Sequence, residues 1–139
     1  MTSMTQAEKQ AFLADVHVGV LALNDGDRGP LMVPMWYDYE PGGELWFLTG
    51  SQTRKGRLIQ VGTRVSLVAQ TEDAPYRYVS VEGPVTAIAP ADPELEGLPM
   101  AVRYLGPEKG KQYFDSMSEW GVTVRVRPER WLAVDYSKS

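Results

Sequence analysis

The chain has 139 residues, no cysteine, one histidine and a formal net charge of −4. A chain of this length usually folds around one hydrophobic core, so we expect residues 1–139 to form a single domain. The lack of cysteine excludes disulfides, thiolate metal sites, iron–sulfur clusters and cysteine nucleophiles. The acidic balance argues against nucleic acid as a partner, because neutralising phosphates requires a basic surface.

The single histidine, His17, limits the possible chemistry further. A histidine-based metal centre would need carboxylates or a second subunit, so we expect no metal site. His17 could serve as a haem ligand or proton donor, although a structural or surface role is commoner for a lone imidazole. No basic start precedes an apolar run, and no apolar stretch is long enough to span a bilayer. We therefore expect a soluble, cytoplasmic protein without membrane contacts.

The first half of the chain predicts a short helix followed by strands. Thr5 and Glu8 fit a capping box, which predicts a helix that ends near Asp15. The next segments are rich in β-branched, aliphatic and aromatic residues and predict three strands: Val16–Leu23, Leu31–Tyr39 and Glu44–Thr49. We expect the second and third to form a hairpin. Pro34 lacks a backbone donor and should lie at an edge, at a bulge or beside a ligand.

The second half predicts more strands, interrupted by helices. The apolar spacing changes to about 3.6 residues between Gly50 and Gly62, which predicts a short helix. A bend is expected at Gly83-Pro84, inside the longest of four further strands: Arg64–Thr71, Tyr76–Ala89, Gly121–Arg127 and Arg130–Tyr136. Asp92 and Pro93 predict the start of a helical region, with a second short helix at 108–117.

Taken together, these elements predict a mainly β protein with six or seven antiparallel strands. Helices stand at the start of the chain and between the fifth and sixth strands, and they do not alternate regularly with strands. This order excludes a doubly wound sheet and favours a small closed or split barrel with peripheral helices.

The most informative segment for function is Thr49–Arg57, which joins a predicted strand to a predicted helix and contains three cations. Free amides, the helix dipole and fixed positive charge together favour an anion such as phosphate at a helix start. Thr53, Lys55 and Arg57 recur at every second residue and could project to one side. A solvated basic turn is the alternative, since the spacing of a true P-loop is absent.

Aromatic residues crowd the central strands: Trp36, Tyr37, Tyr39, Trp46, Phe47, Tyr76 and Tyr78. A flat heteroaromatic ring could lie among some of them, although most aromatic residues in strands serve packing. No pair of side chains stands out as a general acid and base, so the catalytic residues stay unknown. A protein of this kind can leave the chemistry to a bound cofactor.

Eight short segments, taken in order, cover nearly the whole chain: Phe12-Leu13, Gly19–Ala22, Pro34–Tyr39, Gly43–Phe47, Arg54–Arg57, Arg64–Leu67, Tyr78–Gly83 and Pro128–Trp131. Together they resemble the pyridoxamine 5′-phosphate oxidase-like flavin-binding split-barrel family. More particularly, the chain is similar to its small actinobacterial branch of flavin- or deazaflavin-dependent oxidoreductases. The resemblance implies an antiparallel split barrel and a homodimer with the cofactor at the subunit interface.

The resemblance also implies roles for individual residues. Lys55 matches the family's phosphate lysine, Arg57 the arginine two positions later, and Thr53 the polar or basic residue two positions earlier. The strand whose backbone borders the cofactor ring corresponds to four residues: Val33, Pro34, Met35 and Trp36. The positions where the family often has an aromatic residue near the cofactor or substrate correspond to Tyr76 and Tyr78.

The chain departs from the family in one segment. Leu31–Pro34 replaces the basic-rich strand of the true pyridoxamine phosphate oxidases, which argues against vitamin B6 oxidation and against FMN binding of that type. The branch that the chain resembles often uses coenzyme F420, a deazaflavin.

The resemblance thus implies an oxidoreductase that uses F420 or FMN to transfer a hydride to a small organic acceptor with an activated double bond. Two alternatives stay open: a flavin or haem carrier without turnover, and a dimeric fold that has lost its cofactor. The choice between FMN and F420 and the physiological acceptor are not determined by the sequence.

Overall fold

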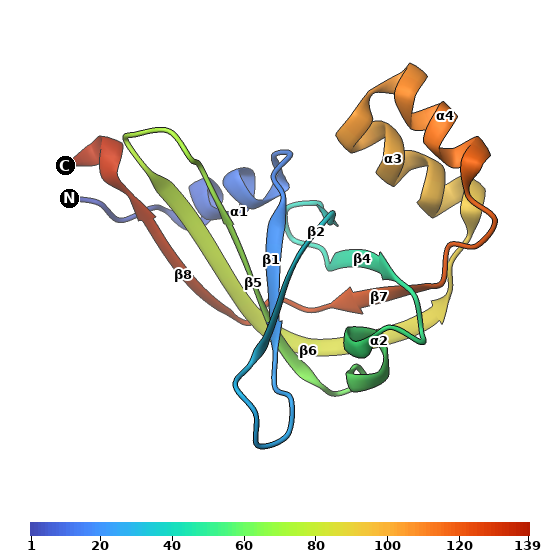
Figure 1. The fold of residues 1–139 in the computed structure, drawn as a ribbon. Coiled ribbons are helices and arrows are strands. Elements are labelled where there is room, and N and C mark those ends of the chain that lie inside the picture. The colour runs from blue at the N-terminus through green and yellow to red at the C-terminus, as the bar shows by residue number, and fades with distance from the viewer.

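Eight antiparallel strands form one curled sheet with helices at its periphery (Figure 1). The computed structural model describes residues 1–139. The strands are β1 (Gly19–Leu23), β2 (Leu31–Met35), β3 (Asp38–Tyr39), β4 (Leu45–Thr49), β5 (Arg64–Gln70), β6 (Arg77–Pro90), β7 (Val122–Val126) and β8 (Arg130–Asp135). The helices are α1 (Gln6–Ala14), α2 (Arg54–Leu58), the π-helical turn η1 (Pro93–Gly97), α3 (Leu98–Leu105), α4 (Pro107–Ser116) and the 3₁₀ turn η2 (Tyr136–Lys138). None of these helices combines the length and the apolar character that crossing a membrane requires.

The barrel is split between β2 and β3. The strand order is β2-β1-β5-β6-β7-β4-β3, with β8 paired to β6 beside this path. The two end strands are separated in sequence only by Trp36 and Tyr37, but they form no hydrogen-bonded pair with each other. The sheet therefore curls until its ends meet without closing. The mainly β split barrel expected from the sequence is confirmed.

Strand β6 belongs to both halves of the sheet. Its first part pairs with β5 and β8, and its last part, from Val85 on, pairs with β7, with a register shift between Val85 and Ala87. The predicted bend at Gly83-Pro84 lies directly before this change of partner. A Cβ at Gly83 would lie 1.7 Å from the carbonyl oxygen of Arg127, so the link from β7 to β8 can cross the strand only at a glycine.

Because side chains alternate along each strand, the paired residues fall into rows that point either to the inner, core-facing side of the sheet or to its outer face. One row of paired residues points into the barrel: Val33, Leu21, Leu67, Val81 and Trp131. All of them except Val33 lie in the hydrophobic core or pack against it. The next row points away from it: Pro34, Val20, Val68, Ser80 and Leu132. We call the side of β2, β1, β5, β6 and β8 that carries this second row the outer face. Four of the five residues in this second row are apolar, whereas the neighbouring row on the same face contains Ser66, Glu82 and Arg130.

The local helix signals are confirmed. Thr5 and Glu8 form the capping box of α1, and the carboxylate of Asp92 accepts hydrogen bonds from the amides of Glu94 and Leu95. Strand β1, however, begins at Gly19 and not at Val16. Residues 16–18 instead form the link from α1 to the sheet.

The predicted hairpin of Leu31–Tyr39 with Glu44–Thr49 is wrong for most of its length. Strand β2 pairs with β1, and only the two residues of β3 pair with β4. The physical reason lies in the junction between β2 and β3, whose backbone groups are satisfied by side chains of α3 rather than by a neighbouring strand.

Candidate functional site

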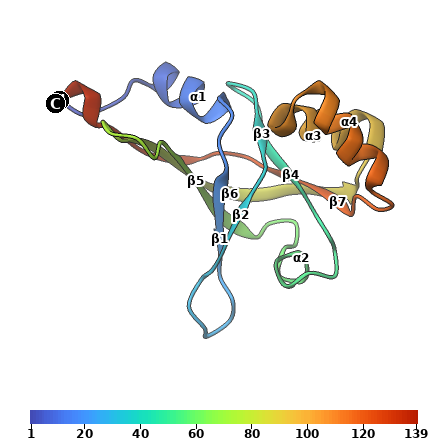
Figure 2. The same ribbon diagram turned by 45° about the horizontal axis from the view of Figure 1, so that its top comes forward.

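The largest cavity lies between the sheet and the α3–α4 helix pair, which stands over β4 and β7 (Figures 1 and 2). Its volume is about 460 Å³. Trp36 and the loop Thr49–Gln52 form the sheet side, and the helix side comes from Met100, Tyr113, Met117, Glu119 and Trp120. A cavity of this size, with both apolar and polar groups in its lining, is typical of a small-molecule site.

The loop that lines this cavity continues into the basic helix α2. Thr53 is the N-cap of α2: its hydroxyl donates to the carbonyl of Gly50 at 2.8 Å and accepts from the amide of Gly56 at 3.1 Å. A Cβ at Gly56 would lie 2.1 Å from the same Gly50 carbonyl oxygen, so the loop is tightly closed. The Thr53 hydroxyl therefore shapes the loop, with its hydrogen already directed to Gly50.

The three cations of α2 have different environments. Arg54 forms an ion pair with the buried carboxylate of Asp25, with Nε 2.8 Å from Oδ2. Arg57 donates from Nε to the carbonyl of Gln52 at 3.0 Å and lines a smaller cavity of about 150 Å³. Lys55 is half-buried, with no hydrogen-bond or ion-pair partner, and lines neither of these cavities. Neither Lys55 nor Arg57 is neutralised by a carboxylate, so both are available to an anion.

Strand β2 was expected to border a cofactor ring, and its successive side chains point alternately into the barrel and to the outer face. Val33 and Met35 point to the inside of the barrel, and Pro34 points to the outer face on an edge strand, as its missing donor predicts. Trp36 follows the strand, and of these four residues it alone lines the largest cavity.

Tyr76 and Tyr78 lie at the β5–β6 hairpin, which is far from α2 in Figure 1. Tyr78 pairs with Gln70 and Val134, and it shares the outer face with Pro34. Within one chain the structure does not bring these tyrosines to Lys55 and Arg57.

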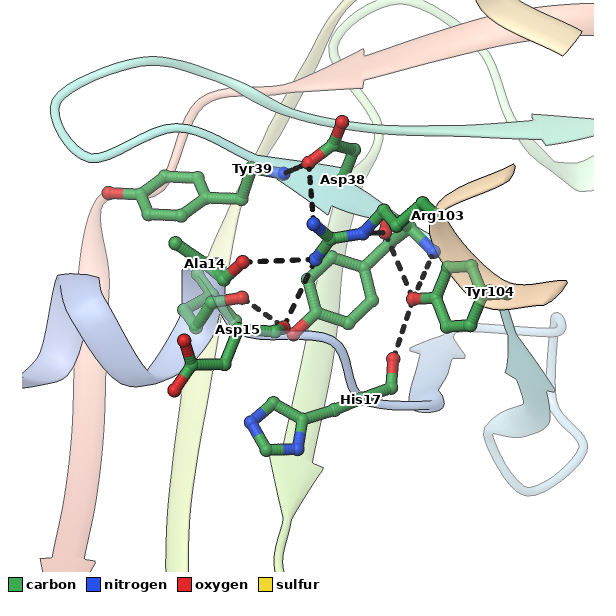
Figure 3. A network of polar contacts seen from close by, with 9 residues as sticks. Ala14, Asp15, His17, Asp38, Tyr39, Arg103 and Tyr104 are labelled. Carbon is green, nitrogen blue, oxygen red and sulfur yellow. Dashed lines mark hydrogen bonds and ion pairs between the residues drawn. The ribbon is translucent and has the colours of Figure 1, made fainter. Parts of the chain in front are cut away.

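Arg103, on α3, binds the junction of the barrel in a network that the sequence did not predict (Figure 3). Its guanidinium donates to the carbonyl of Tyr37 at 3.0 Å and to those of Ala14 and Asp15 at 3.1 and 3.0 Å. It also forms an ion pair with Asp38 at 3.2 Å, and its side chain is only 15% exposed. One side chain therefore joins α3 to the end of α1 and to the split between β2 and β3.

Tyr104 completes this network (Figure 3). Its phenol oxygen accepts a hydrogen bond from the amide of Tyr37 at 3.0 Å and donates to the carbonyl of His17 at 2.6 Å. Burial raises the pKa of both phenols, Tyr37 and Tyr104, so both stay protonated. The ring of Tyr104 stacks on Trp36, which connects the network to the wall of the largest cavity.

His17 has the structural role that is commoner for a lone imidazole. Its ring stacks on Phe12 with centroids 4.4 Å apart, and Nε2 lies 3.1 Å from the carbonyl oxygen of Phe12. Burial lowers its pKa below the ordinary value, because desolvation disfavours the charged ring.

The helix side of the cavity was missed by the sequence analysis. Tyr113 and Trp120 contact each other edge to face, with centroids 5.9 Å apart, and Trp36 contacts Tyr113 at 5.5 Å. The only signal in the sequence was the aromatic pair Tyr113-Phe114, followed by Trp120 directly before Gly121. This pattern does not by itself distinguish a packed core from a binding site.

Comparisons with known proteins agree with this architecture. The family model for pyridoxamine 5′-phosphate oxidase matches residues 5–135. The conserved hypothetical protein Rv2991 from Mycobacterium tuberculosis is 30% identical, with a TM-score of 0.75 over 99% of this chain and 88% of that chain. A solved F420 reductase is 29% identical, with a TM-score of 0.69 over 88% of this chain and 94% of that chain.

The FAD binding protein from Mycobacterium smegmatis shares the fold at 16% identity, with a TM-score of 0.62 over 94% of this chain and 95% of that chain. No curated protein matches the sequence. The family match extends over nearly all of the split barrel, from the N-cap of α1 to the end of β8. The chain therefore belongs to the pyridoxamine 5′-phosphate oxidase family.

Proposed function

We propose that the protein is an oxidoreductase that binds a flavin-type cofactor, F420 or FMN, and passes a hydride to a small organic acceptor. The proposal rests on one observation: the loop Thr49–Gln52 lines the largest cavity and leads through the N-cap Thr53 into two cations without carboxylate partners, Lys55 and Arg57. The family supports a flavin-type cofactor, and the similarity to an F420 reductase supports F420 as one of the two candidates.

The donor set fits a phosphate-bearing cofactor. Lys55 and Arg57 would hold the phosphate, and Thr53 would hold the loop in shape through its cap. Hydrogen bonds between charged partners contribute about 1.5–3 kcal/mol each. In its reduced form such a cofactor supplies a hydride. The cavity wall around Trp36 and Trp120 would exclude water and orient the acceptor.

A homodimer would complete the site. The outer face presents exposed apolar side chains, among them Met32 at 63% and Leu132 at 62% exposure, and such faces commonly mark interfaces. Pro34 and Tyr78 lie on this face, whereas α2 of the same chain lies far from the β5–β6 hairpin (Figure 1). We propose that a second copy covers the outer face and that the cofactor lies at this interface.

Cofactor titration of a Lys55→Ala variant tests the proposal. FMN and F420 are titrated side by side, and the affinity for the true cofactor should fall roughly 10- to 100-fold, the equivalent of one charged hydrogen bond. The melting temperature of the apoprotein should stay unchanged, since Lys55 has no partner to lose. Lys9→Ala on α1, also half-buried and without a partner, is the matched control. An unchanged affinity in Lys55→Ala would overturn the phosphate assignment.

A second measurement separates an enzyme from a carrier. The protein is mixed with reduced F420, or with FMN and NAD(P)H, and offered quinones, enones or tetrapyrroles. Consumption of electrons above the protein-free rate supports the oxidoreductase. A bound cofactor that is never turned over would support the carrier instead.

A further inference from the structure

The charge of the largest cavity differs from that of the loop beside it. Arg54, Lys55 and Arg57 do not line the cavity, and Glu119 is the only side chain in its lining that is charged at neutral pH. Glu119 is exposed and has no ion-pair or hydrogen-bond partner. An anionic ligand would meet this carboxylate without a compensating cation, whereas a cationic ligand would neutralise it.

The aromatic walls favour the same sign of charge. Trp36, Tyr113 and Trp120 follow one another around the cavity, with neighbouring centroids 5.5 and 5.9 Å apart. The faces of aromatic rings carry negative electrostatic potential and attract organic cations, most strongly when the ring is tryptophan. Met100 and Met117 add polarizable thioethers that pack well against flat rings.

Two of these three walls, Trp36 and Trp120, are held in place before any ligand arrives. Trp36 lies parallel to Tyr104, whose hydroxyl is fixed by Tyr37 and His17. The indole of Trp120 rests on the backbone at Gly97, where an added Cβ would lie 2.7 Å from the ring. Fixed aromatic walls lose little conformational entropy on binding, which favours planar ligands that match their spacing.

We infer that this cavity binds a planar organic cation, such as an N-alkylated heteroaromatic ring, and rejects carboxylates of the same ring size. The ligand class follows from Glu119, the three aromatic rings and the absence of a lining cation. Its role as the hydride acceptor rests on the proposed function.

Three probes of one ring size test the ligand class: N-methylacridinium, neutral acridine at mildly alkaline pH, and acridinecarboxylate. Each is titrated into the apoprotein, and binding is followed by quenching of tryptophan fluorescence from the cavity wall. The expected order of affinity is cation, neutral ring, anion. Equal affinities, tighter binding of the carboxylate, or no binding by any probe would overturn the inference.

Substitutions in the cavity assign the effect to its residues. Glu119→Gln should weaken N-methylacridinium roughly three- to fivefold, as expected for one partly exposed charge pair, and leave neutral acridine unchanged. Tyr113→Leu should weaken all three probes. Glu108→Gln removes an exposed carboxylate of α4 outside the cavity lining and should change none of them. A Glu119→Gln variant that keeps the full preference for the cation would contradict the proposed site.

These titrations need no cofactor. A result for Lys55→Ala that overturns the proposed function therefore leaves the acridine affinities interpretable. Conversely, a failure of the acridine series leaves the phosphate assignment intact.

Discussion

The phenol of Tyr104 lies parallel to the indole of Trp36, with ring centroids 5.0 Å apart and an interplanar angle of 5°. The oxygen of the same phenol receives the amide hydrogen of Tyr37, at the split of the barrel. One side chain of α3 thus satisfies the backbone where β2 and β3 part and supports the wall of the largest cavity. The stability of the split and the shape of the cavity are therefore linked.

Removal of the Tyr104 hydroxyl should destabilise the fold. Tyr104→Phe keeps the stacked ring but leaves the Tyr37 amide and the His17 carbonyl without a partner, which should lower the free energy of unfolding by about 1–3 kcal/mol. Urea denaturation measures the change. Tyr136→Phe removes a phenol oxygen that has no hydrogen bond and serves as control. Equal stability of the two variants would contradict the role given to Tyr104.

Substitutions at Thr53 should show how much the cap of α2 contributes to stability and to cofactor binding. Thr53→Val removes the cap of α2 and should lower the free energy of unfolding by about 1 kcal/mol, whereas Thr53→Ser keeps the hydroxyl and should be nearly neutral. If Thr53 acts by shaping the loop, cofactor affinity should follow the same pattern. A valine variant with wild-type stability would show that the cap is unimportant.

An alanine at Gly83 should strain the crossing of β6 with the link to β8. The new Cβ would lie 1.7 Å from the oxygen and 2.8 Å from the carbon of the Arg127 carbonyl, so the backbone must move. We expect a loss of about 1–3 kcal/mol or more in unfolding free energy. Gly29→Ala meets no atom within 4 Å and is the control. Comparable thermal melts for both variants would disprove the tight crossing.

The stability of the protein should depend on pH through His17. Burial holds its pKa in the folded state below the ordinary value of about 6.5, so the unfolded chain binds a proton first as the pH falls. The free energy of unfolding should therefore decrease as the pH drops through 6.5 towards the folded-state pKa. In His17→Gln this part of the slope should disappear. Denaturation curves at several pH values test it, and an unchanged slope would exclude His17 as the cause.

A charge on the outer face should break the proposed dimer. Leu132→Arg places a guanidinium on the face that a second copy would bury, and it should weaken association at least about tenfold. Light scattering after size-exclusion chromatography reports the mass. Leu95→Arg, at a 75% exposed leucine on η1, is the matched control. A Leu132→Arg protein with the mass of the wild type would argue against this interface.

Helix starts and strands that depend on interactions between residues close in sequence could be predicted from the sequence. The capping box of Thr5 and Glu8 and the cap at Asp92 satisfy backbone amides within three residues, so the signal lies in the local sequence. The alternation of β5 and β6 could be predicted because successive side chains point to opposite sides of a strand. The basic helix after β4 was also recognisable from its cations and its preceding hydroxyls.

Elements set by distant residues could not be predicted. Leu31–Tyr39 has the composition of one continuous strand. The strand is interrupted because Arg103 and Tyr104, more than 60 residues away in sequence, form hydrogen bonds with the backbone of Tyr37. Strands β7 and β8 also look like a pair, yet β7 lies between β6 and β4 while β8 pairs with β6. Strand pairing depends on which edges meet, and composition does not encode this.

The sequence alone determined the fold class, the family resemblance and the basic helix, because each depends on residue types and short spacings along the chain. Only the tertiary structure decided that Thr53 caps rather than projects, that Pro34 and Tyr78 share the outer face, and that Trp36, Tyr113 and Trp120 enclose one cavity. The physical reason is that hydrogen-bond partners and cavity walls form between segments far apart in sequence, where folding rather than local preference sets the geometry.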